Sequence, residues 1–181
     1  MAEVVEAYRD YTPPIDARCV VEDLLSSVPP EHMVGLAQIV LTNSGALTGQ
    51  RKRSWTRRLG RKVRHVDAAG LYHQAWKGQP AWIELFVDQV AIGMPALLLR
   101  VRLLRSMVFG TVLFHEIGHH IHRVMRPEHR EREHVADDWA MRLGRIHIRR
   151  RHPVARVILR PIVWTLRQMR RSRHRSAQYC V

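Results

Sequence analysis

The chain has few cysteines and no long apolar runs. Cys19 and Cys180 are the only cysteines among 181 residues, which excludes a cysteine-based metal motif and is typical of a protein in a reducing cytosol. No uncharged apolar run reaches the roughly 18 residues that a membrane-spanning helix needs. Residues 1–6 carry no basic group and no long apolar stretch, so no secretory signal is predicted. We therefore expect a cytoplasmic protein.

Acidic residues are missing from the C-terminal part of the chain. After Asp138 there are twelve arginines and no acidic side chain, although the first fifty residues hold seven acidic and two basic side chains, a net charge of −5. The whole chain has a formal charge of +14. Such uneven charge indicates an anionic partner or a solvated basic face.

Residues 149–181 predict a basic amphipathic helix, because arginines and apolar side chains fall on opposite faces. Its apolar face could pack on the rest of the protein. The helix could instead lie on an anionic membrane surface, which would make the protein peripheral, or contact nucleic acid. The arginines on one face are Arg156, Arg160, Arg167 and Arg171, and the apolar residues mostly opposite are Val154, Ile158, Ile162, Leu166 and Met169.

Apolar residues make up 46% of the chain and charged residues 25%, which are the proportions of a globular protein. We predict a flexible lead over residues 1–14, one domain over residues 15–148, and a basic extension over residues 149–181. The domain should be of the α+β class, with a short mixed sheet.

Within this domain the pattern of apolar residues predicts a helix capped by Asp16, a strand over residues 36–41, and a hairpin of residues 70–75 and 81–87. A long helix should begin near Met94 and be buried on most sides. Eight basic residues lie between positions 51 and 64 and predict a loop or a solvated helix.

The segment His115-Glu116-Ile117-Gly118-His119 predicts a metal site. On a helix, His115 and His119 lie one turn apart on the same face, so that two imidazoles can reach one ion. Glu116 lies about 100° further round the helix, close enough to a metal-bound water to act on it without being a ligand. Gly118 costs about 1 kcal/mol in a helix interior, so we expect another backbone to pack close to it.

A second acidic segment begins fourteen residues after His119. Glu133 with Asp137 at i+4 fits a helix that brings one carboxylate to the metal and uses another to orient a histidine. We favour Glu133 as the third ligand because the residues after Asp137 would anchor its helix in a core: Trp139, Ala140, Met141 and Leu143.

Other ligand sets stay open at this point. Glu128, Glu131 or His134 could replace Glu133 at the metal, and the carboxylate at 137 could be an ordinary exposed one. His122 is three residues from His119 and offers a rival pair of imidazoles, but this pair lacks a glutamate at the position of a general base.

These residues resemble the gluzincin metallopeptidases, in which a His-Glu-x-x-His helix is followed by a glutamate helix with Glu-x-x-x-Asp. The resemblance covers roughly residues 70–145. It implies a zincin-like domain, Zn²⁺ as cofactor, and His115, His119 and Glu133 as its ligands. It also implies Glu116 as general base and Asp137 as the partner of His115.

The activity that this resemblance implies is zinc-dependent hydrolysis of peptide bonds in a protein or peptide substrate. Three protein ligands leave a fourth position for a water, from which Glu116 would take a proton. The alternative is a non-catalytic basic protein that binds nucleic acid or a membrane surface and has a structural or vestigial metal site.

In zinc peptidases an extended substrate commonly lies along an edge strand just before the active-site helix. The resemblance therefore implies a substrate rim formed by Trp82, Ile83, Glu84 and Leu85, although an ordinary strand without substrate contact would give the same pattern. The residue that stabilises the oxyanion is not assigned by the motif, and the candidates for it are Tyr72, His147 and His152.

Overall fold

A four-stranded mixed sheet forms the centre of the protein. The computed structural model describes residues 2–58, 61–125 and 133–153. The sheet has the order β1-β2-β6-β5, in which β1, β2 and β6 are parallel and β5 is antiparallel to β6. The predicted α+β class is confirmed. The strands are β1 (Glu3–Glu6), β2 (Leu36–Thr42), β5 (Gly70–His73) and β6 (Ala81–Phe86).

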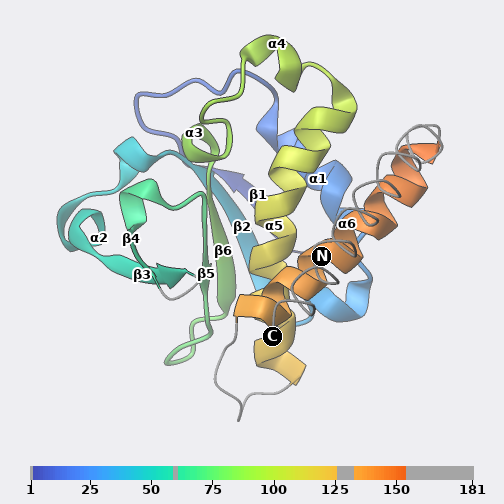
Figure 1. Ribbon diagram of the computed structural model, residues 1–181. Helices are drawn as coiled ribbons and strands as arrows, with labels where there is room; N and C mark the ends of the chain where they lie inside the picture. Colours follow the sequence, from blue (N-terminus) through green and yellow to red (C-terminus); the bar gives the residue numbers. More distant parts are fainter. Residues whose placement is uncertain (1, 59–60, 126–132, 154–181) are drawn as a thin grey trace, which may run out of the picture.

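Helices cover one face of this sheet, as Figure 1 shows. The helix α1 (Ala17–Leu25) and the long helix α5 (Arg102–Met125) pack on the sheet, and α6 (Glu133–Arg151) crosses α5 on its outer side. The shorter helices are α2 (Gly49–Arg53), α3 (Val87–Val90) and α4 (Ala96–Leu99), and the 3-10 turns are η1 (Pro30–Met33), η2 (Ser44–Ala46) and η3 (His65–Asp67).

The main core lies between the sheet and the helices α1 and α5. Leu24, Ile39, Ile83 and Leu113 are fully buried there. Alternate residues of β6 point to opposite faces, so Phe86 belongs instead to a smaller cluster on the second face of the sheet. The sheet is thus covered on both faces, with the larger core on the side of α5.

The helix predicted after Asp16 is confirmed as α1. The Asp16 carboxylate accepts a hydrogen bond of 2.8 Å from the backbone N–H of Cys19, which satisfies one of the free N–H groups at the start of the helix. The predicted strand over residues 36–41 is confirmed as β2, and the predicted hairpin as β5 and β6. Lys77 and Gly78 both have positive φ angles in its turn, as a tight hairpin requires.

Two sequence predictions were wrong. Residues Glu3–Glu6 are not part of a flexible lead but form β1, which pairs in parallel with β2. The basic segment 51–64 is neither a loop nor a solvated helix throughout, because β3 (Trp55–Arg58) and β4 (Arg61–Arg64) form an antiparallel hairpin after α2. Both errors concern strand pairing, which the hydrophobic pattern of such short segments does not reveal.

The prediction that residues 81–87 form an edge strand was also wrong. The strand β6 lies between β2 and β5, so neither of its sides is an edge. Ile83 and Leu85 are fully buried in the main core, and Glu84 is buried on the opposite face. Trp82, Ile83, Glu84 and Leu85 therefore do not form a rim at the border of the sheet, and the border strand next to them is β5.

The buried residues of the long helix α5 lie between Ser106 and His122. Leu97 and Leu98 of α4 and Val101, just before α5, are exposed, so the prediction of burial on most sides fails there. The helix α6 continues past position 148, and the basic helix predicted beyond it lies mostly outside the described residues. Among the described residues, no helix is long and apolar enough to cross a membrane.

Candidate metal centre

The two histidines of the motif lie in the buried half of α5. His115 is 6% exposed and His119 is 8% exposed, although both are polar. Their neighbours Phe114, Ile117 and Ile121 belong to the main core and fix the rotation of the helix. The histidines consequently point away from the sheet core and toward α6.

Gly118 allows α6 to approach α5 closely. A Cβ atom at this position would lie 2.7 Å from the backbone oxygen of Ala136 and 2.8 Å from its Cα. Real Cβ atoms do not come so close to backbone atoms, so only glycine fits. Ala136 is fully buried at this contact. The expectation that another backbone packs against Gly118 is confirmed, and the contact brings the start of α6 to the histidines.

Three donor atoms from α5 and α6 converge. The Nε2 atoms of His115 and His119 lie 3.1 Å apart, and Nε2 of His115 lies 3.4 Å from Oε2 of Glu133. One donor atom from each of the three residues lies within 4.8 Å of the other two. Among the described residues, this is the one group of histidine, cysteine and acidic side chains that could hold a metal ion.

The surroundings of Glu133 support a bound cation. Its Oε2 atom is buried and has no hydrogen-bond partner among the described residues. A buried carboxylate oxygen without a partner is costly, and a metal ion shared with the imidazoles would satisfy it. Glu133 is also the first residue of α6, where the partial positive charge of the helix end favours a carboxylate.

Asp137 orients His115. Nδ1 of His115 donates a hydrogen bond of 2.9 Å to Oδ1 of Asp137. With its proton on Nδ1, the imidazole presents the lone pair of Nε2 to the other donor atoms. Asp137 lies one turn after Glu133 on α6, so a single helix supplies both carboxylates, as the spacing predicted.

Glu116 lies between α5 and the border strand β5. It is 7% exposed, and a Cβ atom at Gly70 of β5 would lie 2.9 Å from both its Cγ and its Oε1. The carboxylate therefore needs the absence of a side chain at position 70. Sequence reasoning missed Gly70; the available signal was a lone glycine at the start of a strand, which often marks a close approach of another group.

The other histidines of this segment have different environments. His120 is 1% exposed, its Nε2 donates to the backbone oxygen of Val34 over 3.0 Å, and its Nδ1 lies 3.3 Å from the hydroxyl of Tyr72. Burial lowers the pKa of His120, so this ring is held neutral as a core residue. His122 does not join the metal group, and His134 is exposed. Glu128 and Glu131 lie outside the described residues.

Two of the three oxyanion candidates, His147 and His152, lie away from the centre. His147 lies fourteen residues after Glu133 along α6, which is about 21 Å of helix. Its Nδ1 lies 3.0 Å from the hydroxyl of Ser27 on the C-terminal side of α1, and His152 stacks edge-on against it. The hydroxyl of the third candidate, Tyr72, lies 3.3 Å from Nδ1 of His120, the residue that follows His119 in α5. His147 and His152 belong to the far end of α6.

Glu84, which was predicted to belong to the substrate rim, contacts side chains of the protein itself. It forms an ion pair with Arg51 and a hydrogen bond with His73, whose Nε2 lies 3.3 Å from the carboxylate. Trp82 stacks on His73 with ring centroids 3.9 Å apart. These contacts lie on the face of the sheet opposite to α5 and hold the α2 segment on it.

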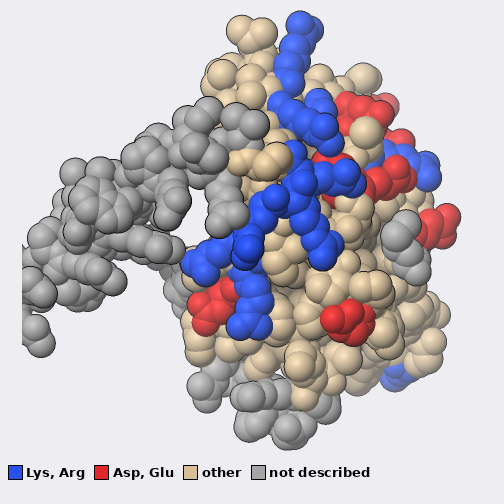
Figure 2. All heavy atoms as spheres, turned by 90° about the vertical axis from the view of Figure 1, so that its right-hand side faces the viewer, with Lys and Arg blue, Asp and Glu red and all other residues tan. Residues whose placement is uncertain are grey.

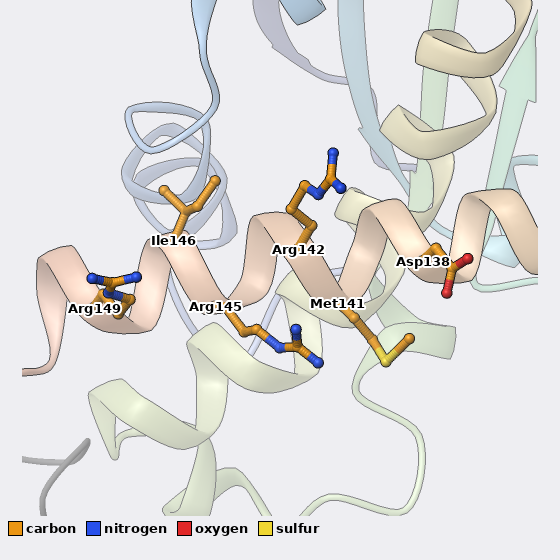
Figure 3. A pocket seen from close by; sticks show the side chains of 6 residues that line it. All are labelled: Asp138, Met141, Arg142, Arg145, Ile146 and Arg149. Atoms are coloured by element: carbon orange, nitrogen blue, oxygen red, sulfur yellow. The ribbon is translucent and has the colours of Figure 1, made fainter.

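A hollow on the outer side of α6 is separate from the metal centre. Figure 3 shows its side chains projecting from one stretch of this helix, with arginines at three positions. None of them belongs to the group that could hold a metal. The lining residues are Asp138, Met141, Arg142, Arg145, Ile146 and Arg149.

Comparison with protein-family models, with curated proteins and with solved structures gives no match for this chain. The likeness to gluzincins therefore depends on the spacing of His115, Glu116, His119, Glu133 and Asp137 and on their geometry.

Proposed function

We propose that the protein is a zinc-dependent metallopeptidase of the gluzincin type. The observation that carries this proposal is the convergence of His115 Nε2, His119 Nε2 and Glu133 Oε2, with the Glu116 carboxylate adjacent to them in sequence and buried. Two neutral imidazoles and one carboxylate are a ligand set of catalytic zinc sites, which keep one position open.

The donor atoms suit zinc better than calcium or magnesium. Donors about 2.0–2.2 Å from a tetrahedral zinc lie roughly 3.3–3.6 Å from one another. The separations of 3.1 Å and 3.4 Å are close to this range. Calcium and magnesium prefer oxygen ligands in larger number, and two imidazoles do not suit them.

In the proposed reaction, the protein residues position the reactants and move one proton. Bound zinc would supply a Lewis acid and an acidified water. His115, held by Asp137, and His119 fix the ion, and Glu116 accepts a proton and returns it to the leaving amine. The burial of Glu116 against Gly70 keeps its carboxylate in one place. The residue that stabilises the oxyanion is not assigned.

The substrate position in this proposal changes from β6 to β5. The strand β5 is the last of the four-stranded sheet, and its Gly70 contacts Glu116. An extended peptide can add to the border of a sheet through backbone hydrogen bonds. We place the peptide substrate along β5, which would bring its carbonyl group toward the metal ligands.

Hydrolysis of a peptide library by the full chain tests the proposal. Activity should disappear with chelator and return with zinc. Glu116→Gln should keep the metal and lose at least roughly a hundredfold in rate, because a general base contributes about 10²–10⁴-fold. Glu31→Gln, which changes an exposed glutamate, is the matched control. Metal-loaded protein with no hydrolysis that depends on Glu116 would reject the peptidase.

A second candidate function is binding of a polyanion without catalysis. Arg142, Arg145 and Arg149 follow one another along the outer side of α6 (Figure 3) and line its hollow. Such a row could neutralise phosphates, which gives binding that weakens with salt. A DNA shift at two salt concentrations, with Arg145→Ala plus Arg149→Ala as the weakened variant, separates this function from the first.

A further inference from the structure

Four exposed aliphatic residues lie in the segment between α3 and the start of α5. Ile92 is 72% exposed, Leu97 71%, Val101 48% and Leu98 40%. Single exposed apolar residues are ordinary, but a cluster of large aliphatic ones marks an interaction surface. We define this set of four residues as the apolar tip. It is remote from the metal centre, because Arg102 is thirteen residues before His115, about 20 Å along the helix.

The backbone holds the apolar tip in an outward position. The turn of α4 is closed by a hydrogen bond of 2.9 Å from the N–H of Leu98 to the oxygen of Pro95, and Val101 donates to the oxygen of Leu98 over 3.1 Å. Leu99 of the same turn is fully buried and anchors it. The exposed side chains are therefore presented by a fixed turn.

Exposed basic side chains lie beside the apolar tip. Residues 89–115 contain no acidic side chain, and Arg100 and Arg102 are exposed beside the tip. Asp23 pairs with both Arg102 and Arg151, so the end of α6 lies at the same end of the molecule. Figure 2 shows Lys and Arg side chains running from the top of this face, where α4 lies, down its middle.

We propose that the apolar tip docks on the surface of an anionic lipid bilayer. Aliphatic side chains would enter the boundary between headgroups and acyl chains, while the surrounding arginines would contact anionic headgroups. Arg100 and Arg102 form a basic rim beside the apolar tip. Docking on an anionic bilayer requires both an apolar group and basic groups of this kind. The apolar tip lies at the opposite end of α5 from the metal centre. Docking of the tip would therefore keep the metal centre on the aqueous side of the bilayer surface.

Other occupants fit the surface less well. Proteins that bind single-stranded nucleic acid stack the bases on aromatic side chains, but the apolar tip has no aromatic residue. Residues 154–181 contain seven arginines and no acid, so the basic rim would repel them. An anionic bilayer combines both features that the tip offers.

Vesicle flotation with the full chain tests the proposal. The vesicles are phosphatidylcholine alone or phosphatidylcholine mixed with phosphatidylglycerol. The wild type should float with the anionic vesicles only, and Leu97→Ser plus Val101→Ser should bind them at least roughly tenfold more weakly, because two buried aliphatic groups are lost. The matched control is Val124→Ser plus Met125→Ser, since these side chains are 51% and 64% exposed at the other end of α5.

A second variant tests membrane contact of the tip without removing an apolar side chain, so that a folding defect of the first variant does not decide the result. In Leu97→Trp, the added indole should show a blue-shifted emission relative to the wild type when anionic vesicles are added. Equal binding by the tip variant and its control would overturn the proposal, because arginines alone would then hold the protein. Absence of wild-type flotation would also overturn it. Binding to DNA in a shift assay without any binding to vesicles would overturn it as well. Metal content, unchanged in all variants, separates this outcome from the fate of the peptidase.

Discussion

The start of α5 and its longer buried part both contain apolar residues, but their environments differ. From Phe109 to His122 nearly every residue is buried, including five histidine and glutamate side chains, whereas Val101 and Met107 near its start are exposed. The buried half is enclosed by α6, β5 and the sheet. At the start of the helix, Arg102 pairs with Asp23 of α1. Polar groups can be held in a core only where neighbouring elements supply partners, and α6 does this for one half alone.

The closest contact between α5 and α6 is at Gly118. Replacing this glycine should have the largest effect on stability. Gly118→Ala should lower the free energy of unfolding by about 1–3 kcal/mol or more, because the new methyl group would overlap the backbone of Ala136. Urea unfolding of metal-free protein measures this change. In contrast, Gly144→Ala in α6 should raise stability by up to about 1 kcal/mol, because its Cβ would meet only Phe114 at 4.0 Å. Equal effects at both glycines would contradict the close approach.

The second prediction concerns the effect of Asp137 of α6 on metal affinity. Asp137→Ala should weaken metal binding by about 10–100-fold, because His115 would lose the acceptor that fixes its ring. Competition with a chromogenic chelator measures the affinity. Asp138→Ala changes the neighbouring carboxylate, which is exposed and lines the hollow of α6, and should leave the affinity unchanged. If the two variants behaved alike, the aspartate would act only through charge.

The smallest effect concerns the far end of α6. Burial lowers the pKa of His147, with the nearby Asp23 opposing this, so the folded protein holds the ring neutral. An unfolded histidine titrates near pH 6.5 and binds protons more readily, so the stability from this group is present above about pH 6.5 and is lost as the pH falls through the lower, folded pKa.

Unfolding of metal-free protein between pH 7 and 5 checks this pH dependence. His147→Gln removes the titrating group and should reduce the slope of stability against pH. His134→Gln, which changes an exposed histidine, should keep the wild-type slope. An unchanged slope in His147→Gln would show that this ring is not the group responsible.

The sequence predicted the grouping of His115, His119 and Glu133 better than it predicted the sheet. The turn-by-turn spacing of His115 and His119, and of Glu133 and Asp137, depends only on helix geometry, and Gly118 indicated the helix contact. Pairing of β1 with β2 depends on residues more than thirty positions apart, and no local pattern encodes it. The same limit led us to place the substrate on β6, because strand order, which makes β5 the border, cannot be read from alternation alone.

The contact of Gly70 with Glu116 is another non-local feature. It joins β5 to α5 across more than forty residues, and its sequence signal was one glycine. The exposure of the apolar tip could not be predicted either, because Leu97 and Val101 fit the apolar pattern of a buried helix. Their environment depends on which elements reach that end of α5.

Metal analysis of protein purified without added metal tests the central claim most directly, combined with X-ray absorption of the bound ion. The account predicts about one zinc per chain, with two imidazole ligands and oxygen donors at about 2.0–2.2 Å, and loss of that metal in His115→Ala plus His119→Ala. Glu133→Ala should bind the ion much more weakly. Full retention of zinc by these variants, or a wild type without any bound metal, would contradict the account.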